Sequence, residues 1–250
     1  MLSEWTNEKL EWYVRASQME GFHMALADNI RQFLKPTDIL VDIGSGPALI
    51  DFELANDVNE IVAIDINKKV LGWADEEAKS RGISNFRTIA GDCKNDLDAL
   101  LPDRFDVAVS SFFGGAGSVF DKAYQGANRL VVFITHPTDR FFVSGIGKAE
   151  LHHVLESDLD DYLITGKFKY HKIMKEFDFG QPLVSIEEAR RFLDVYSLNG
   201  EDGSEERMAY IEKKLALIEK ANDSRYPYRL PKKRKAVFFY IEKQRLPHSE

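Results

Sequence analysis

The sequence is poor in cysteine, in long apolar runs and in positive charge. Its 250 residues include one cysteine, which excludes an internal disulfide and a multi-cysteine metal site. No apolar run approaches the roughly 20 residues needed to cross a bilayer. Residues 1–5 lack the basic start and apolar stretch of a secretory signal. We therefore expect a cytoplasmic protein that neither crosses nor binds a membrane.

The charge balance is acidic, with 33 Lys and Arg against 41 Asp and Glu and a formal net charge of -8. Tight binding to a nucleic acid requires a concentrated basic surface, so this balance argues against such a partner. One basic run, residues 231–235, precedes the last apolar segment, and we interpret it as a solvated turn. The apolar fraction of 44% is typical of a globular protein with a buried core.

Short apolar, β-branched runs recur through the middle of the sequence. They begin 20 to 25 residues apart, and amphipathic stretches such as residues 68–81 lie between them. This alternation predicts βαβ units and a parallel sheet. The continuous apolar character of the runs suits strands that are covered on both faces. We predict an α/β fold with a doubly wound, mostly parallel sheet, whose strands include residues 38–43, 60–66, 85–90, 105–110 and 129–135.

Helices are predicted on both sides of this core in the sequence. Residues 4–34 predict one or two helices, interrupted only at Gly21, and Pro36 ends them. After the core we expect a helix at 144–163, a strand at 168–179, a helix with a capping box at 185–196, a helix at 205–221 and a strand at 236–243. We interpret the chain as one domain, 1–250, with an N-terminal helical cap (1–36), a ligand-binding core (37–138), a lid or substrate region (139–228) and a closing strand and tail (229–250).

A glycine-rich turn follows the first predicted strand, in the segment Asp42-Ile43-Gly44-Ser45-Gly46-Pro47-Ala48. Glycine permits a sharp turn and the close approach of a ligand, and the N-terminus of the next helix offers free N–H groups. A dinucleotide site of the form Gly-x-Gly-x-x-Gly would need a third glycine where Leu49 stands. An NAD-type oxidoreductase is therefore the less favoured interpretation.

Asp42, Gly44 and Gly46, with Ala48 in place of a further glycine, resemble the first motif of the class I S-adenosylmethionine (SAM)-dependent methyltransferases. The run Asp-Ile-Gly-Ser-Gly-Pro is also similar to the nicotinamide and phenylethanolamine N-methyltransferase group. The resemblance covers residues 38–135 and the closing strand. It implies a Rossmann-like methyltransferase domain whose core, 37–138, binds SAM at the carboxyl ends of the strands.

The resemblance also implies roles for single residues. Asp65 would accept hydrogen bonds from both ribose hydroxyls, which suits a carboxylate because it only accepts. Asp92 would accept from the adenine amino group, between Ile66 and Cys93 on the two faces of the ring. The predicted cofactor-binding residues are Asp42, Gly44, Ser45, Gly46, Asp65, Ile66, Asp92, Cys93 and Ser110, with Tyr13 and Arg15 for the methionyl carboxylate. The plainer alternatives are that Asp65 caps a helix, Asp92 belongs to a turn and Cys93 packs in the core.

No motif identifies the catalytic residues. Methyl transfer from a sulfonium is an in-line displacement, so the protein mainly orients the reactants and excludes water. A base is needed only when the acceptor arrives protonated, and the candidates are His136, Tyr13 and His23. We expect no metal site, because the pair His152-His153 has no third ligand within reach in the sequence.

The predicted function is SAM-dependent transfer of a methyl group to a small-molecule acceptor. An RNA or protein methyltransferase and a non-catalytic SAM-binding module are the alternatives, and the acidic charge balance ranks a small acceptor above RNA. The sequence leaves open the acceptor, the element that is methylated and the oligomeric state, a homodimer included.

Overall fold

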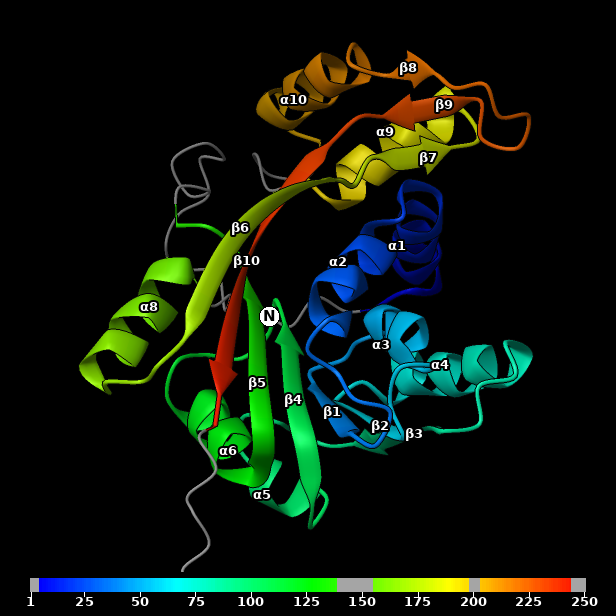
Figure 1. The fold of residues 1–250 in the computed structure, drawn as a ribbon. Coiled ribbons are helices and arrows are strands. Elements are labelled where there is room, and N and C mark those ends of the chain that lie inside the picture. Colours follow the sequence, from blue (N-terminus) through cyan, green and yellow to red (C-terminus); the bar gives the residue numbers. More distant parts are fainter. Residues whose placement is uncertain (1–4, 139–154, 198–202, 244–250) are drawn as a thin grey trace, which may run out of the picture. The chain divides into compact units, whose positions relative to one another are not determined.

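The computed structural model describes residues 5–138, 155–197 and 203–243 (Figure 1). The chain forms two compact units: unit 1 comprises residues 1–6, 23–175 and 235–250, and unit 2 comprises 7–22 and 176–234. This division groups residues 7–22 with residues 176–234. The organisation of 1–250 as one domain with an N-terminal cap at 1–36 stays a prediction. Most of the helix expected at 144–163, with His152 and His153, lies outside the described residues.

Unit 1 contains most of a seven-stranded sheet of order β3-β2-β1-β4-β5-β10-β6, of which residues 176–178 and 233–234 are assigned to unit 2. The neighbouring strands from β3 to β5 are parallel, and β10 is antiparallel to β5. The α/β class and the five predicted parallel strands are thus confirmed, with ends that differ by a few residues. The strands are β1 (Ile39–Ile43), β2 (Glu60–Asp65), β3 (Phe86–Ala90), β4 (Phe105–Ser111), β5 (Ala127–Thr135), β6 (His171–Asp178) and β10 (Lys233–Glu242).

Helices cover both faces of this sheet, which explains why its strands are apolar on both sides (Figure 1). On one face, Val41 and Phe133 belong to a core cluster that includes side chains of α5, α6 and α8. On the other face, the ring of Phe52 of α3 packs against the ring of Phe86 of β3, with ring centres 5.4 Å apart. The helices of unit 1 are α2 (Phe22–Arg31, which begins at the boundary with unit 2), α3 (Leu49–Leu54), α4 (Lys68–Ser80), α5 (Leu97–Leu100), α6 (Ser118–Gly126) and α8 (Glu156–Thr165).

Unit 2 combines helices with a small antiparallel sheet of order β7-β9-β8. Its core includes Trp12, which is 1% exposed and packs edge-on against Phe192 with ring centres 5.2 Å apart. The hydroxyl of Ser185 caps α9 by accepting from the N–H of Glu188 at 3.1 Å, as the capping-box pattern predicts. The elements are α1 (Asn7–Glu20), β7 (Gln181–Leu183), α9 (Ile186–Val195), α10 (Glu205–Leu215), β8 (Glu219–Lys220) and β9 (Tyr228–Leu230).

Gly21 has a φ of 65° and separates α1 from α2, where the sequence predicted the one interruption. The helix α10 ends at Leu215, six residues short of the predicted end at Ala221, because the chain turns there toward β8. In the part of the chain that the structure describes, no helix has the length and apolar character of a membrane span.

Candidate cofactor-binding and active site

The glycine-rich turn after β1 holds its backbone in left-handed conformations. Gly44, Gly46 and Ala48 have φ of 76°, 54° and 55°. Glycine adopts such angles freely, whereas alanine pays in strain. The N–H groups of Gly44 and Ser45 both donate to the carbonyl of Ile64, at 2.8 and 3.0 Å. The turn is therefore fixed to the carboxyl end of the neighbouring strand β2.

Asp65, the last residue of β2, stabilises the same turn by hydrogen bonds. Its Oδ2 accepts from the N–H of Gly46 at 2.9 Å, and its Oδ1 accepts from the N–H of Asn67 at 2.8 Å. Each carboxylate oxygen retains capacity for a further donor, so these bonds leave room for hydroxyl groups of a ligand. Ile66 follows with 48% of its surface exposed, and it offers an apolar side chain at this edge.

Asp92 and Cys93 follow β3 in two different environments. Asp92 accepts from the N–H of Lys94 at 2.9 Å and from the Asn95 side chain at 2.7 Å, and these bonds lower its pKa. Cys93 is 3% exposed within the core cluster, and burial raises the pKa of its thiol to about 12. The structure therefore places an ionised acceptor at this edge. It leaves little of the Cys93 surface for contact with an adenine ring.

Asp42 of β1 forms a pair with Asp51, in the first turn of α3. The two side chains are 2% and 1% exposed, and each one influences the pKa of the other. Burial raises the pKa of Asp42 to about 7 and that of Asp51 well above its ordinary value. Burial thus favours the neutral form of both carboxyl groups.

No hydrogen bond within the described part of the chain reaches Oδ1 of Asp42 or either side-chain oxygen of Asp51. The hydroxyl of Ser45 in the adjoining turn is likewise buried without a partner there. The sequence analysis missed Asp51. The available signal was an acid inside the apolar run Leu-Ile-Asp-Phe, one helical turn after the glycines.

The end of β4 is tied to the turn by Ser110. This side chain is fully buried, and its Oγ lies 3.0 Å from the carbonyl oxygens of both Ile43 and Phe113. A hydroxyl has one proton, so it donates to one of them at a time. The position of Ser110 therefore lets it hold the segment after β4 against the carboxyl end of β1.

Phe112 and His136 lie together at the carboxyl ends of β4 and β5. Phe112 has a φ of 54°, a conformation that costs energy for a bulky residue. Its ring stacks on that of His136 with centres 4.6 Å apart and an interplanar angle of 26°. His136 is 3% exposed. The candidate base thus has its imidazole orientation defined by an aromatic neighbour.

The remaining sequence-predicted residues have other surroundings. Arg15, in unit 2, donates to both carboxylate oxygens of Glu188 at 2.9 and 3.0 Å and to Glu11 at 2.5 Å. Tyr13 packs edge-on against Phe179, also in unit 2. The guanidinium charge of Arg15 is therefore neutralised inside its own unit. His23 is buried in α2 at 5% exposure. No metal-binding group of three His, Cys, Asp or Glu side chains occurs among the described residues.

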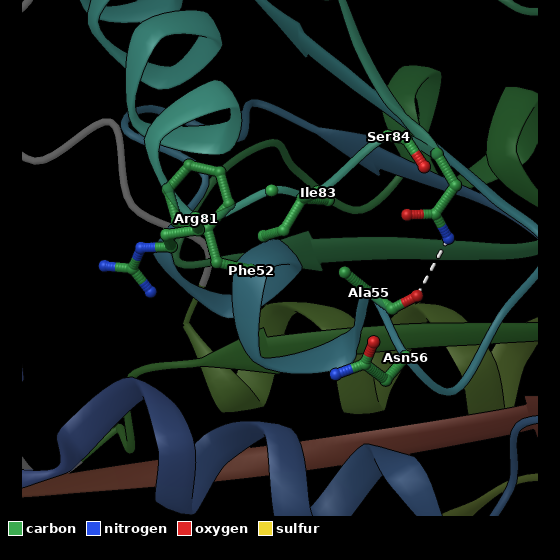
Figure 2. A pocket seen from close by; sticks show the side chains of 8 residues that line it. Phe52, Ala55, Asn56, Arg81, Ile83 and Ser84 are labelled. Atoms are coloured by element: carbon green, nitrogen blue, oxygen red, sulfur yellow. Dashed lines mark hydrogen bonds between the residues drawn. The ribbon is translucent and has the colours of Figure 1, made fainter.

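A surface hollow of about 480 Å³ lies near the amino ends of β2 and β3 (Figure 2). Arg81 lies over the ring of Phe52 there at 4.9 Å, and Asn85 donates to the carbonyl of Ala55 at 2.8 Å. Ligands of open α/β sheets bind beyond the carboxyl ends of the strands. The hollow is at the opposite edge, and we assign it no part in the reaction.

A parallel sheet with a glycine-rich turn and acidic side chains along its carboxyl edge defines a Rossmann-like ligand-binding fold. Residues 34–180 match a family model described as a methyltransferase domain. The chain belongs to this family and is a class I methyltransferase. No curated protein matches the chain. The finer similarity to the nicotinamide and phenylethanolamine N-methyltransferase group is not shown.

Solved structures of low identity share the fold. The YcgJ protein from Bacillus subtilis is 15% identical with a TM-score of 0.55, covering 90% of this chain and 100% of its own. Precorrin-6y C5,15-methyltransferase from Geobacter metallireducens is 14% identical with a TM-score of 0.52, covering 88% and 87%. Magnesium protoporphyrin IX methyltransferase from Synechocystis, with bound SAH, is 12% identical with a TM-score of 0.51, covering 96% and 90%.

Proposed function

We propose that this methyltransferase uses SAM as its methyl donor and methylates a small-molecule acceptor. The observation that carries the proposal is the row of groups at the carboxyl edge: the glycine turn after β1, Asp65 at the end of β2 and Asp92 after β3. A nucleoside cofactor presents two ribose hydroxyls and an amino group, and carboxylates that only accept hydrogen bonds suit these donors. The bound SAH of the Synechocystis enzyme supports the same ligand class.

The turn has the shape that a closely bound ligand needs. Among the described residues outside its own chain neighbours, a Cβ built on Gly46 would have one contact within 4 Å, with the Trp5 ring at 3.8 Å, so the backbone of Gly46 is not tightly packed against other side chains. In our proposal Asp65 holds the ribose, Asp92 the adenine amino group, and Ile66 contacts the adenine ring. When bound, SAM supplies an electrophilic methyl group on a sulfonium. The residues of the chain align donor with acceptor and exclude water, which is worth roughly 7–11 kcal/mol when the alignment is good.

On the acceptor side we propose His136 as the base for an acceptor that arrives protonated. It lies at the carboxyl edge, and its ring is oriented by Phe112. His23 of α2 is the second candidate, and Tyr13 the third. The net charge of -8 supports a small acceptor over RNA, since an RNA acceptor requires basic contacts to phosphate.

Thermal unfolding with SAM, S-adenosylhomocysteine and NAD in parallel tests the cofactor. A ligand at 100 times its Kd adds about 2.7 kcal/mol of stability, so we expect a clear rise in Tm with the first two and none with NAD. Asp65→Ala removes the rise, whereas Asp103→Ala, which replaces an exposed acid before β4, retains it. A rise with NAD alone contradicts the proposal.

Transfer of a labelled methyl group from SAM tests the acceptor class. The enzyme is incubated separately with a pool of small metabolites, with total RNA and with unfolded protein. We expect label in the small-molecule pool only. Label in RNA or protein would contradict a small-molecule acceptor. SAM binding without transfer of label to any of the three pools would contradict methyl transfer to these classes of acceptor.

A further inference from the structure

The side chain of Phe113, directly after β4, has no role in the methyl transfer described above. Its ring is partly buried against the core cluster, and it lies so close to Gly44 that a Cβ on this glycine would overlap it. We propose, on the basis of the proposed function, that Phe113 recognises the sulfonium of SAM by a cation–π interaction and thereby makes the enzyme favour SAM over S-adenosylhomocysteine. No covalent bond is made or broken in this recognition.

The order of the strands along the carboxyl edge matches the order of the chemical groups in SAM. The strands β3, β2, β1, β4 and β5 are neighbours in this order, about 4.8 Å apart. In the proposed binding mode Asp92 after β3 holds the adenine, and Asp65 at the end of β2 holds the ribose. The sulfonium is attached to the ribose on the side away from the adenine, so it lies beyond the ends of β1 and β4. Phe113 follows β4 and contacts Gly44 after β1, so it lies at this position.

The backbone at Phe112 directs two successive aromatic rings to different strand ends. Phe112 has a φ of 54°, and its ring stacks on His136, which follows β5. The next ring, that of Phe113, turns instead to Gly44 after β1. A strained conformation of a bulky residue is retained where the surrounding structure has a use for it. Phe113 therefore lies between the groups proposed for the nucleoside and the base proposed for the acceptor, where the methyl group is transferred.

The ring of Phe113 is within reach of a cation. Nζ of Lys94, in the loop that carries Asp92, is 6.0 Å from the ring centre, at the outer limit of a cation–π contact. The face of an aromatic ring carries partial negative charge and attracts a cation without being ionised. A sulfonium has no N–H or O–H group to donate, as is true of a quaternary ammonium, and aromatic faces suit cations of this kind.

SAM and its product differ in charge at the atom that Phe113 contacts in this proposal. S-adenosylhomocysteine has a neutral thioether in place of the sulfonium, so it retains only the apolar contact with the ring. A cation–π interaction strengthens binding about 3- to 30-fold, and it is strongest where water is excluded. Phe113 therefore gives the methyl donor an advantage of this size over the product, which limits inhibition by the product.

Fluorination of the ring tests the proposal at nearly constant shape. Mono-, di- and trifluorinated phenylalanine replace Phe113 in the full-length enzyme, since each fluorine withdraws negative charge from the ring face. Phe113→Leu completes the series with an apolar side chain that has no aromatic face. The same series at Phe52 is the matched control, because its ring also lies beneath a cation, Arg81 at 4.9 Å, but lines the hollow near the amino ends of the strands. Isothermal titration calorimetry measures the Kd of SAM and of S-adenosylhomocysteine for each protein.

We expect the Kd of SAM to rise with each fluorine at Phe113 and to be about 3- to 30-fold higher in Phe113→Leu, while the Kd of S-adenosylhomocysteine changes less than about twofold. The Phe52 series should leave both constants unchanged. A parallel change for the two ligands, or a Kd of SAM that does not respond to fluorination, would overturn the proposal. Should Phe113→Leu fail to fold, the fluorinated rings are decisive by themselves. Absence of binding of either ligand to the wild type would instead refute the proposed cofactor.

Discussion

The ring of Phe113 lies against the Cα of Gly44. A Cβ built on this glycine would stand 2.2 Å from both Cγ and Cδ1 of the ring, and the φ of Gly44 is 76°. Phe113 follows β4 and Gly44 follows β1, and these strands are neighbours in the sheet. The segment after β4 is therefore packed directly on the glycine turn. Gly44 is required both for the turn and for this contact.

Gly44→Ala should destabilise the enzyme strongly. The left-handed backbone costs an alanine about 1–2 kcal/mol, and the overlap with Phe113 adds about 1–3 kcal/mol of overpacking. We expect the free energy of unfolding, measured by urea denaturation, to fall by about 2–5 kcal/mol. Adding Phe113→Ala to this variant should restore part of the loss from overpacking.

Gly82→Ala is the matched control. Gly82 has a φ of 71°, close to that of Gly44, but a Cβ there would meet no atom of the described residues within 4 Å. Its substitution should cost only the backbone strain of about 1–2 kcal/mol. Equal losses at the two glycines would show that Phe113 does not press on Gly44 in solution.

Cys93 should be an unreactive thiol in the native enzyme. Burial raises its pKa to about 12, and only the thiolate reacts with disulfide reagents. At pH 8 the thiolate population is then about a thousandfold below that of a free thiol, whose pKa is near 8.5. Because Cys93 is the sole cysteine, reaction with a chromogenic disulfide reports on it alone. We expect slow labelling in buffer and immediate labelling in 6 M guanidinium, whereas fast native labelling would contradict its burial.

The parallel core of the fold could be predicted because its strands are buried on both faces. Continuous apolar runs at regular spacing follow from that burial, and each of the five appears in the structure close to its predicted position. The glycine turn could also be located, because positions with left-handed backbone conformations favour glycine. The parallel strands and the glycine turn could both be predicted from residues that are close together in the sequence.

The grouping of the flanking segments depends on distant contacts that no local pattern encodes. Arg15 and Glu188, which join α1 to α9, are 173 positions apart. The glutamate was visible as part of a capping box, but its carboxylate binds Arg15 and the N–H of Val184. Asp51 was not predicted as a site residue for a related reason. The packing of α3 on β1 brings it close to Asp42, and its own neighbours in sequence are apolar.

The ion pair between Arg15 and Glu188 should stabilise unit 2 substantially. The two side chains are 7% and 17% exposed, so removal of Arg15 leaves a largely buried carboxylate without its cation. We expect Arg15→Ala to lower the free energy of unfolding by about 3–5 kcal/mol. The control is Arg190→Ala, which breaks an exposed pair with Glu212 and should cost less than about 1 kcal/mol. Similar losses in the two variants would contradict a buried role for Arg15.

The pair of Asp42 and Asp51 should make stability fall as the pH rises from about 4 to 8. A carboxyl whose pKa is raised by folding contributes stability fully below its unfolded pKa, near 3.9, and loses it as the pH passes the folded value, about 7 for Asp42. Asp51→Asn keeps the size of the side chain and removes one buried ionisation. The free energy of unfolding of the variant relative to the wild type should therefore rise across this range.

Urea denaturation at pH 5, 6, 7 and 8 measures this difference without any cofactor. Carboxylates whose pKa is lowered by folding, such as Asp92 and Asp178, change stability in the opposite direction, but they do so equally in both proteins and cancel. Asp57→Asn, which replaces an acid paired with Arg31 and distant in sequence from the glycine turn, is the control and should run parallel to the wild type. If the Asp51→Asn profile is also parallel, folding does not raise the pKa of Asp51.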